Sequence, residues 1–209
     1  MDRLFNWTKR WGLPGSFTLT CLMSLEAIVL FCVYPRTGRL LAMIAMLFSS
    51  VGDILLMNFH RLFTKIPHFE IGACSFMIAH VFYAWAYGHE LSAFGFPRRA
   101  NAGTVCAGIV LALMFVTVVL LIVVKKRTKP RFIPLMAVYL CFIGLDFLAV
   151  GTYAFAMDRW FSYLAFAGAL SFLISDWFIG LDIVAQTPKL RELVWVFYPI
   201  GQIIMIACA

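Results

Sequence analysis

Apolar residues form seven long runs along the chain, separated by short segments that contain Pro, Gly or charged residues. A helix needs about 20 mainly apolar residues to cross the hydrocarbon core of a bilayer, with about 17 as the lower limit. The runs are too long for barrel strands and do not alternate between apolar and polar positions, so we predict helices. They cover residues 17–34, 39–59, 68–88, 102–124, 132–156, 160–185 and 192–208.

The composition agrees with this pattern, because 63% of the residues are hydrophobic and only 13% are charged. A soluble domain carries about 25% charged residues. We therefore predict an all-α membrane protein in which residues 1–209 form a single transmembrane domain, since no low-complexity stretch divides the chain. Residues 1–16 mix Trp with Arg and Lys, which is typical of a segment that lies in the membrane interface.

The basic residues are distributed unevenly over the two sides of the predicted bundle. Twelve of the 17 Lys and Arg residues lie on the side of the N-terminus. Short connections rich in Lys and Arg stay in the cytoplasm, so we predict a cytoplasmic N-terminus and an external C-terminus. This orientation accounts for the net charge of +7 without a nucleic acid partner. We expect a bacterial inner membrane location and no obligatory protein partner.

Ionisable residues inside the predicted spans are few, and each costs about 2.5–3.5 kcal/mol at the centre of a helix on insertion scales. Helical spacing groups several of them with other residues on common faces. At about 1.5 Å per residue, most of these groups reach a similar depth in the half of the bundle nearer the N-terminus. The groups are Ser49 and Asp53; Gly72, Phe76, His80 and Tyr83; Gly168, Phe172, Asp176 and Gly180; and Tyr198 and Gln202.

Each intramembrane polar residue also has a structural interpretation. Asp146 reads as a polar residue that packs between helices. Glu26 stands apart on the first helix and is either a structural hydrogen-bonding group or a member of a site. His80 also suits an interhelical hydrogen bond. Asp53 and Asp176 are the hardest to explain by structure alone, so we predict that they carry the function.

Four motifs, each on its own predicted helix, resemble those of the YhhN-like lysoplasmalogenase family in content and order. The resemblance covers about residues 40–206, and it implies that the first predicted helix corresponds to the second of the eight spans usual in the family. The motifs are Ser50-Val51-Gly52-Asp53, Gly72-x3-Phe76-x3-His80-x2-Tyr83, Gly168-Ala169-x2-Phe172-x2-Ser175-Asp176 and Tyr198-x3-Gln202.

The resemblance implies an integral membrane hydrolase that takes a lysophospholipid substrate within the membrane. Such an enzyme cleaves the vinyl ether bond of lysoplasmalogens to a fatty aldehyde and glycerophosphoethanolamine or glycerophosphocholine. The motifs carry over Asp53, His80, Asp176, Tyr198 and Gln202 as functional residues, with a weaker case for Tyr139 in the fifth helix.

Vinyl ether hydrolysis begins when an acid delivers a proton to the alkene carbon distal to oxygen, and water then adds to the oxocarbenium ion. The reaction needs one carboxyl that is protonated near pH 7 and one carboxylate, which two acids in an apolar pocket provide. We predict that Asp53 and Asp176 are this catalytic pair, in either order of roles. The remaining candidates would bind substrate or position water: His80, Tyr139, Tyr198, Gln202 and Glu26.

Two other classes of function share some of these features. Intramembrane Asp and His residues also mark proton-coupled transporters, many of which contain internal repeats. Here the segments that end at Asp53 and Asp176 are only faintly similar in sequence. A zinc-dependent lipid hydrolase would need about three His ligands or their equivalents, and only His80 of the four His lies well inside a span. We therefore expect no metal and no other cofactor. A receptor-like bundle would hold the two aspartates on separate faces.

Overall fold

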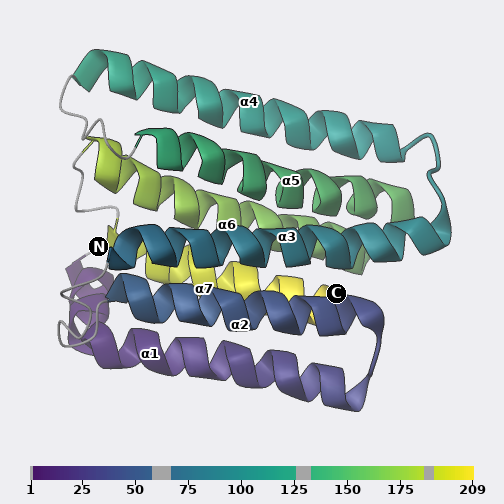
Figure 1. The fold of residues 1–209 in the computed structure, drawn as a ribbon, viewed down its shortest axis with the longest axis horizontal. Helices are drawn as coiled ribbons and strands as arrows, with labels where there is room; N and C mark the ends of the chain where they lie inside the picture. The colour runs from purple at the N-terminus through teal and green to yellow at the C-terminus, as the bar shows by residue number, and fades with distance from the viewer. Residues whose placement is uncertain (1, 58–66, 126–132, 186–190) are drawn as a thin grey trace.

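The computed structural model describes residues 2–57, 67–125, 133–185 and 191–209, and these ranges are almost entirely helical (Figure 1). The order of the helices is the one that the hydrophobic pattern predicts. They are α1 (Asp2–Val33), α2 (Thr37–Met57), α3 (His68–Phe94), α4 (Ala100–Lys125), α5 (Ile133–Met157), α6 (Trp160–Ala185) and α7 (Arg191–Cys208).

Within the described residues, six helices are long and apolar enough to cross a membrane, and α7 is a shorter apolar helix. With 18 residues, α7 lies close to the lower limit of about 17 for a span. The prediction of an all-α membrane bundle is therefore confirmed. Several basic residues that set the predicted orientation lie outside the described residues: Arg61, Lys65, Lys126, Arg127, Lys129, Arg131 and Lys189.

Two helix boundaries differ clearly from the predicted ones. The first helix begins at Asp2, so residues 2–16 continue into the predicted span at 17–34 as one helix. Helix α3 runs past residue 88 to Phe94, so it includes polar residues that the hydropathy pattern had left outside the helix. It ends at Gly95, whose φ of 80° disfavours any residue with a Cβ atom. Hydropathy therefore located the apolar part of each helix and missed the polar ends.

The helix axes are roughly aligned with one another, and α1 and α4 lie at opposite edges of the bundle in Figure 1. Helix α3 packs between α2 and α5, while α7 packs on α6 and also reaches α1 and α2. Helix α4 packs on α5 and, to a smaller extent, on α6. Helices α2, α3, α5, α6 and α7 therefore enclose the interior.

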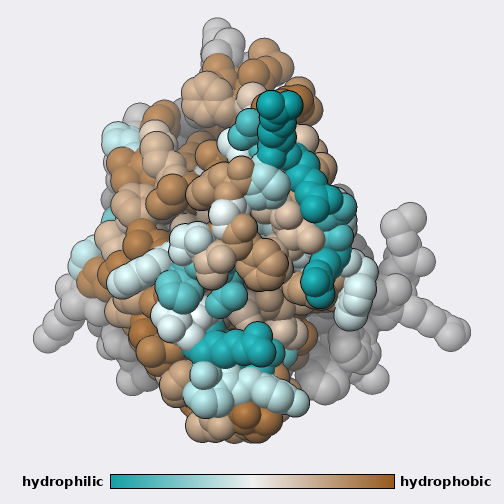
Figure 2. Space-filling model, turned by 90° about the vertical axis from the view of Figure 1, so that its right-hand side faces the viewer, coloured by the Kyte–Doolittle hydropathy of each residue, from teal (hydrophilic) through white to brown (hydrophobic). Residues whose placement is uncertain are grey.

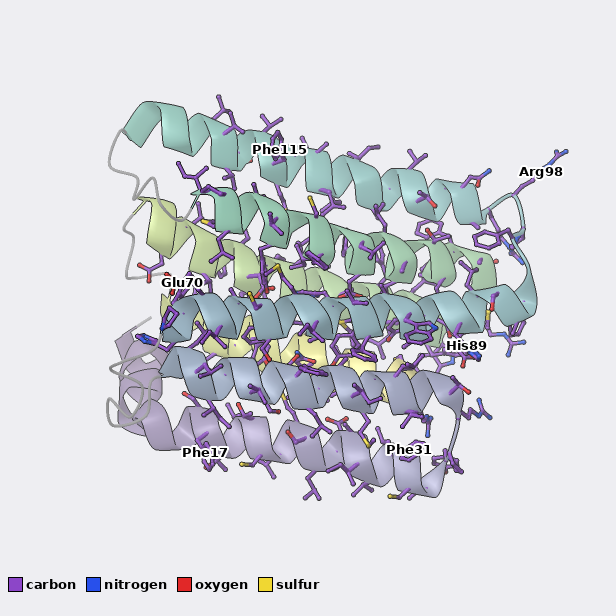
Figure 3. The ribbon with its side chains drawn as sticks, in the orientation of Figure 1. Phe17, Phe31, Glu70, His89, Arg98 and Phe115 are labelled. Carbon is purple, nitrogen blue, oxygen red and sulfur yellow. The ribbon has the colours of Figure 1, made fainter. Side chains whose placement is uncertain are left out.

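The outer surface is apolar along the helices and polar at the ends. Large side chains such as Leu113 (63% exposed) and Phe115 (58% exposed) point outward from α4. Figure 3 shows Phe17 and Phe115 on the outer helices, whereas Glu70 and His89 lie toward opposite ends of the bundle. In the end-on view of Figure 2, polar residues gather across this end of the molecule and apolar ones surround them. This distribution suits a bundle surrounded by lipid.

The interface of α6 and α7 depends on two glycines that let the backbones approach closely. A Cβ atom on Gly201 would lie 2.7 Å from the backbone nitrogen of Phe172 and 2.8 Å from the carbonyl oxygen of Gly168. Neither backbone atom has room to move aside as a flexible side chain would. The close contact in turn sets the position of Tyr198 and Gln202 on α7.

We expect Gly201→Ala to destabilise the fold, because overpacking of a fitted interface costs about 1–3 kcal/mol. The measurement is the thermal unfolding midpoint of the purified protein in one detergent. The control is Gly88→Ala in α3, where an added Cβ would meet no atom within 4 Å. Alanine favours a helix over glycine by about 1 kcal/mol, so Gly88→Ala should keep or raise the midpoint. A Gly201→Ala midpoint at or above that of the unchanged protein would contradict the packing argument.

Candidate active site

Asp53 lies near the end of α2 with only 5% of its surface exposed. Its Oδ2 atom accepts two hydrogen bonds, one from Thr20 Oγ1 on α1 at 2.8 Å and one from Tyr198 OH on α7 at 2.8 Å. Ser49, one turn earlier, is fully buried, as expected for residues on one helix face. The Asp53 carboxyl therefore joins three helices inside the bundle.

Gln202 forms a second link between α7 and the rest of the bundle. Its Nε2 atom donates to Ser49 Oγ at 3.2 Å, and its Oε1 atom accepts a hydrogen bond from Tyr83 OH. All three side chains are fully buried. The amide thus fixes α7 against both α2 and α3, one turn away from the contact of Tyr198 with Asp53.

His80 is fully buried on α3 and lies between two carboxyl groups. Its Nδ1 atom is 3.0 Å from Asp146 Oδ2 on α5, and its Nε2 atom is 3.4 Å from Asp176 Oδ2 on α6. A neutral imidazole carries only one N–H, so both contacts become hydrogen bonds only when the ring or one carboxyl holds a further proton. This His80 cluster, made of His80, Asp146, Asp176 and Tyr139, is therefore suited to hold a transferable proton.

Tyr139 completes the His80 cluster from α5. Its hydroxyl donates to Asp176 Oδ2 at 2.7 Å and lies 3.3 Å from His80 Nε2. Asp176 Oδ2 thus faces both the phenol and the imidazole. Within the described residues no hydrogen bond engages the other oxygen of Asp176, and 7% of its side chain is exposed. One oxygen of the carboxyl is therefore held while the other is available.

Phe172 contacts one neighbour of each aspartate that the sequence predicts to be catalytic. Its ring is 4.9 Å from the His80 ring and 5.4 Å from the Tyr198 ring, measured between centroids. Asp53 and Asp176 thus belong to separate hydrogen-bonded groups in the same region of the interior. In the described part of the chain no hydrogen bond joins their carboxyl groups directly.

A cleft opens beside the His80 cluster and encloses about 760 Å³ of space, counted out to its open mouth. Side chains of α2, α3, α4, α5 and α6 line it. Asp176 and Tyr139 supply its hydrogen-bonding oxygens, and the rest of the wall is apolar apart from the indole of Trp177. The group around Asp53, with Tyr198 and Gln202, lies behind this wall. There the ring centroids of Phe76 and Tyr198 are 6.0 Å apart.

Glu26 lies apart from these groups. Its side chain is partly buried on α1, and among the described residues no hydrogen bond ties it to Asp53 or to the His80 cluster. Among the described residues, no group of three His, Cys, Asp or Glu side chains is arranged to bind a metal ion.

Two members of these groups were missed by the sequence analysis. Asp146 was interpreted as a packing residue, yet it holds one nitrogen of His80. Its position seven residues after Tyr139 places both on one face of α5, a signal that was present in the spacing. Thr20 gave no signal, because a hydroxyl in an apolar helix is common and often bonds to its own backbone.

Comparisons with known proteins agree with the resemblance that the motifs indicate. The chain is 26% identical over 196 residues to the human (Homo sapiens) protein named lysoplasmalogenase TMEM86A, a match that covers 90% of this chain and 72% of that protein. No solved structure matches the chain. The model of the YhhN family matches residues 16–209, which include every residue of the two aspartate-centred groups. The protein is a multi-pass membrane protein and belongs to the YhhN family.

Proposed function

We propose that the protein is a lysoplasmalogenase, which hydrolyses the vinyl ether bond of a lysoplasmalogen within the membrane. The observation that carries this proposal is the placement of Asp176 and Tyr139 on the wall of an otherwise apolar cleft. A lipid with a single reactive ether needs such an environment, namely an apolar cleft with one acidic group at the level of the reacting bond. Membership of the YhhN family and the name of the human relative support the same activity.

In this proposal Asp176 is the general acid. Its protonated carboxyl donates to the alkene carbon distal to oxygen, where a C–H bond forms from the π electrons and an oxocarbenium ion results. The Asp176 oxygen that accepts from Tyr139 stays anchored during the transfer. His80, placed between Asp176 and Asp146, exchanges a proton with Asp176 and restores the acid after each turnover.

Asp53 is the second carboxylate of the proposed mechanism. Its negative charge stabilises the oxocarbenium ion across the low-dielectric interior from behind the cleft wall. The water that adds to the cation gives its proton to the His80 cluster, and His80 returns that proton to Asp176. The resulting hemiacetal then collapses: its hydroxyl loses a proton as the C=O bond of the aldehyde forms, the C–O bond to glycerol breaks, and that proton passes to the glycerol oxygen. Tyr198 and Thr20 hold Asp53 in place. Gln202 positions α7, and Glu26 takes no step in this mechanism because it lies apart from both groups.

The test is to incubate the purified protein in detergent with a lysoplasmalogen and, separately, with an acyl lysophospholipid of the same head group. We expect free aldehyde from the first lipid and no free fatty acid from the second. Fatty acid release from the acyl lipid without aldehyde release would instead favour a different intramembrane lipid hydrolase. Absence of both products, together with proton flux across liposomes that contain the protein, would favour the transporter interpretation.

A further inference from the structure

The cleft beside Asp176 is a groove with two helical walls. Helix α4 packs on α5 and α6, while α3 packs on α2 and α5, so α3 and α4 contribute the opposite sides and α5 and α6 the floor. Met114 comes from the α4 side and Phe76 from the α3 side.

The polar groups lie at mid-height in this groove. On α6 the lining runs from Gly180 through Asp176 to Leu173, and at about 1.5 Å per residue Asp176 lies about 6 Å from the level of Gly180. On α5, which runs in the opposite direction, the lining runs from Leu135 through Tyr139 to Ile143. Apolar walls therefore continue on both sides of the reactive carboxyl.

We propose that the half of the groove beyond Asp176, formed by Met114, Ile143 and Leu173, holds the carbons of the hydrocarbon chain that directly follow the vinyl ether. This inference rests on the proposed function. The glycerol then lies in the half near Gly180, and the head group points toward the end of the bundle at which the sequence pattern predicts most of the Lys and Arg. A phosphate is attracted to that end by charge. The occupant is thus a lysolipid with one chain and its double bond at the level of Asp176.

Steric fit, and not apolar burial, selects the chain in this arrangement. The chain leaves a bilayer whose lipid tails are as apolar as the side chains of the groove, so its transfer brings little hydrophobic gain. Met114 has an unbranched, flexible side chain that adapts to the occupant. A rigid side chain at this position shortens the groove and excludes long chains.

The experiment compares Met114→Trp with Leu113→Trp, which places the same indole on the outer surface of α4, where Leu113 is 63% exposed. Aldehyde release is measured from two lysoplasmalogens, one with a long alkenyl chain and one whose chain ends a few carbons after the double bond. For Met114→Trp we expect the long-to-short ratio of kcat/KM to fall by at least about tenfold, and for Leu113→Trp to stay as in the unchanged protein. An unchanged ratio in Met114→Trp, or an equal loss for both lipids, overturns the inference.

A second measurement does not depend on turnover. A non-hydrolysable ether lysophospholipid with a diazirine in its chain is photolysed with each variant, and the labelled peptides are identified. We expect labelling next to Met114 and Ile143 in the unchanged protein and its loss in Met114→Trp. Labelling spread over outward residues such as Leu113 would overturn the chain site. If the unchanged protein releases no aldehyde from either lipid, the proposed function fails, and this labelling still decides where a lipid chain binds.

Discussion

Asp176→Asn should lower aldehyde release from a lysoplasmalogen by about 10²–10⁴-fold, the usual contribution of a general acid. An amide is close in size to the carboxyl and still accepts a hydrogen bond from Tyr139, which donates to Asp176 Oδ2 at 2.7 Å. It has no acidic proton to deliver to carbon. The loss should therefore appear in kcat, with the fold and the binding of the lipid retained. The measurement is the rate of aldehyde formation by a protein that elutes as the unchanged protein does.

The matched control is Asp158→Asn, the same exchange at the opposite end of the bundle. Asp158 is exposed, contacts Arg99 and Tyr163, and has a φ of 51°, a conformation that Asn adopts readily. The Asp158→Asn variant should release aldehyde as fast as the unchanged protein. Near-normal turnover by Asp176→Asn would remove this carboxyl from the chemistry and leave the cleft without an acid.

Asp53→Asn should lower the same rate by about 10²–10³-fold, comparable with the loss of one preorganised group that stabilises charge in a transition state. The amide oxygen still accepts the hydrogen bonds of Thr20 and Tyr198, so the contact of α1, α2 and α7 persists. Only the negative charge is lost. Aldehyde formation is again the measurement, with the unfolding midpoint as the check on structure.

Tyr198→Phe separates the charge of Asp53 from its hydrogen bonds. It keeps the carboxylate and removes one of its two donors, so the fall in rate should be smaller than for Asp53→Asn. If Asp53→Asn is nearly as active as the unchanged protein while Asp176→Asn is inactive, the paired-aspartate mechanism is wrong. The His80 cluster would then catalyse the reaction without charge stabilisation by Asp53.

The sequence predicted the helices well because the membrane imposes a simple rule on length and polarity. It also predicted that Asp53, His80, Asp176 and Tyr198 reach the same region of the interior, and the structure places them in two neighbouring groups. Spacing along one helix defines a face and a depth. It does not define how far each helix is rotated toward its neighbours.

That rotation explains the parts of the site that the sequence left open. The contact of Asp146 with His80 and the place of Phe172 between the two groups depend on how α3, α5 and α6 turn toward one another. Those angles follow from side-chain packing over the whole bundle, including glycine contacts such as Gly168 with Gly201. No local motif contains them.

The position of Tyr198 on α7, the last helix of the described ranges, has a consequence for biosynthesis. Asp53 is synthesised early, on α2, while one of its two donors is added only after α1 to α6 have been synthesised. Until then Thr20 is the donor that the neighbouring first helix provides. Insertion of α7, which is the shortest helix of the described ranges and contains Pro199, then supplies the second hydrogen bond to the Asp53 carboxyl.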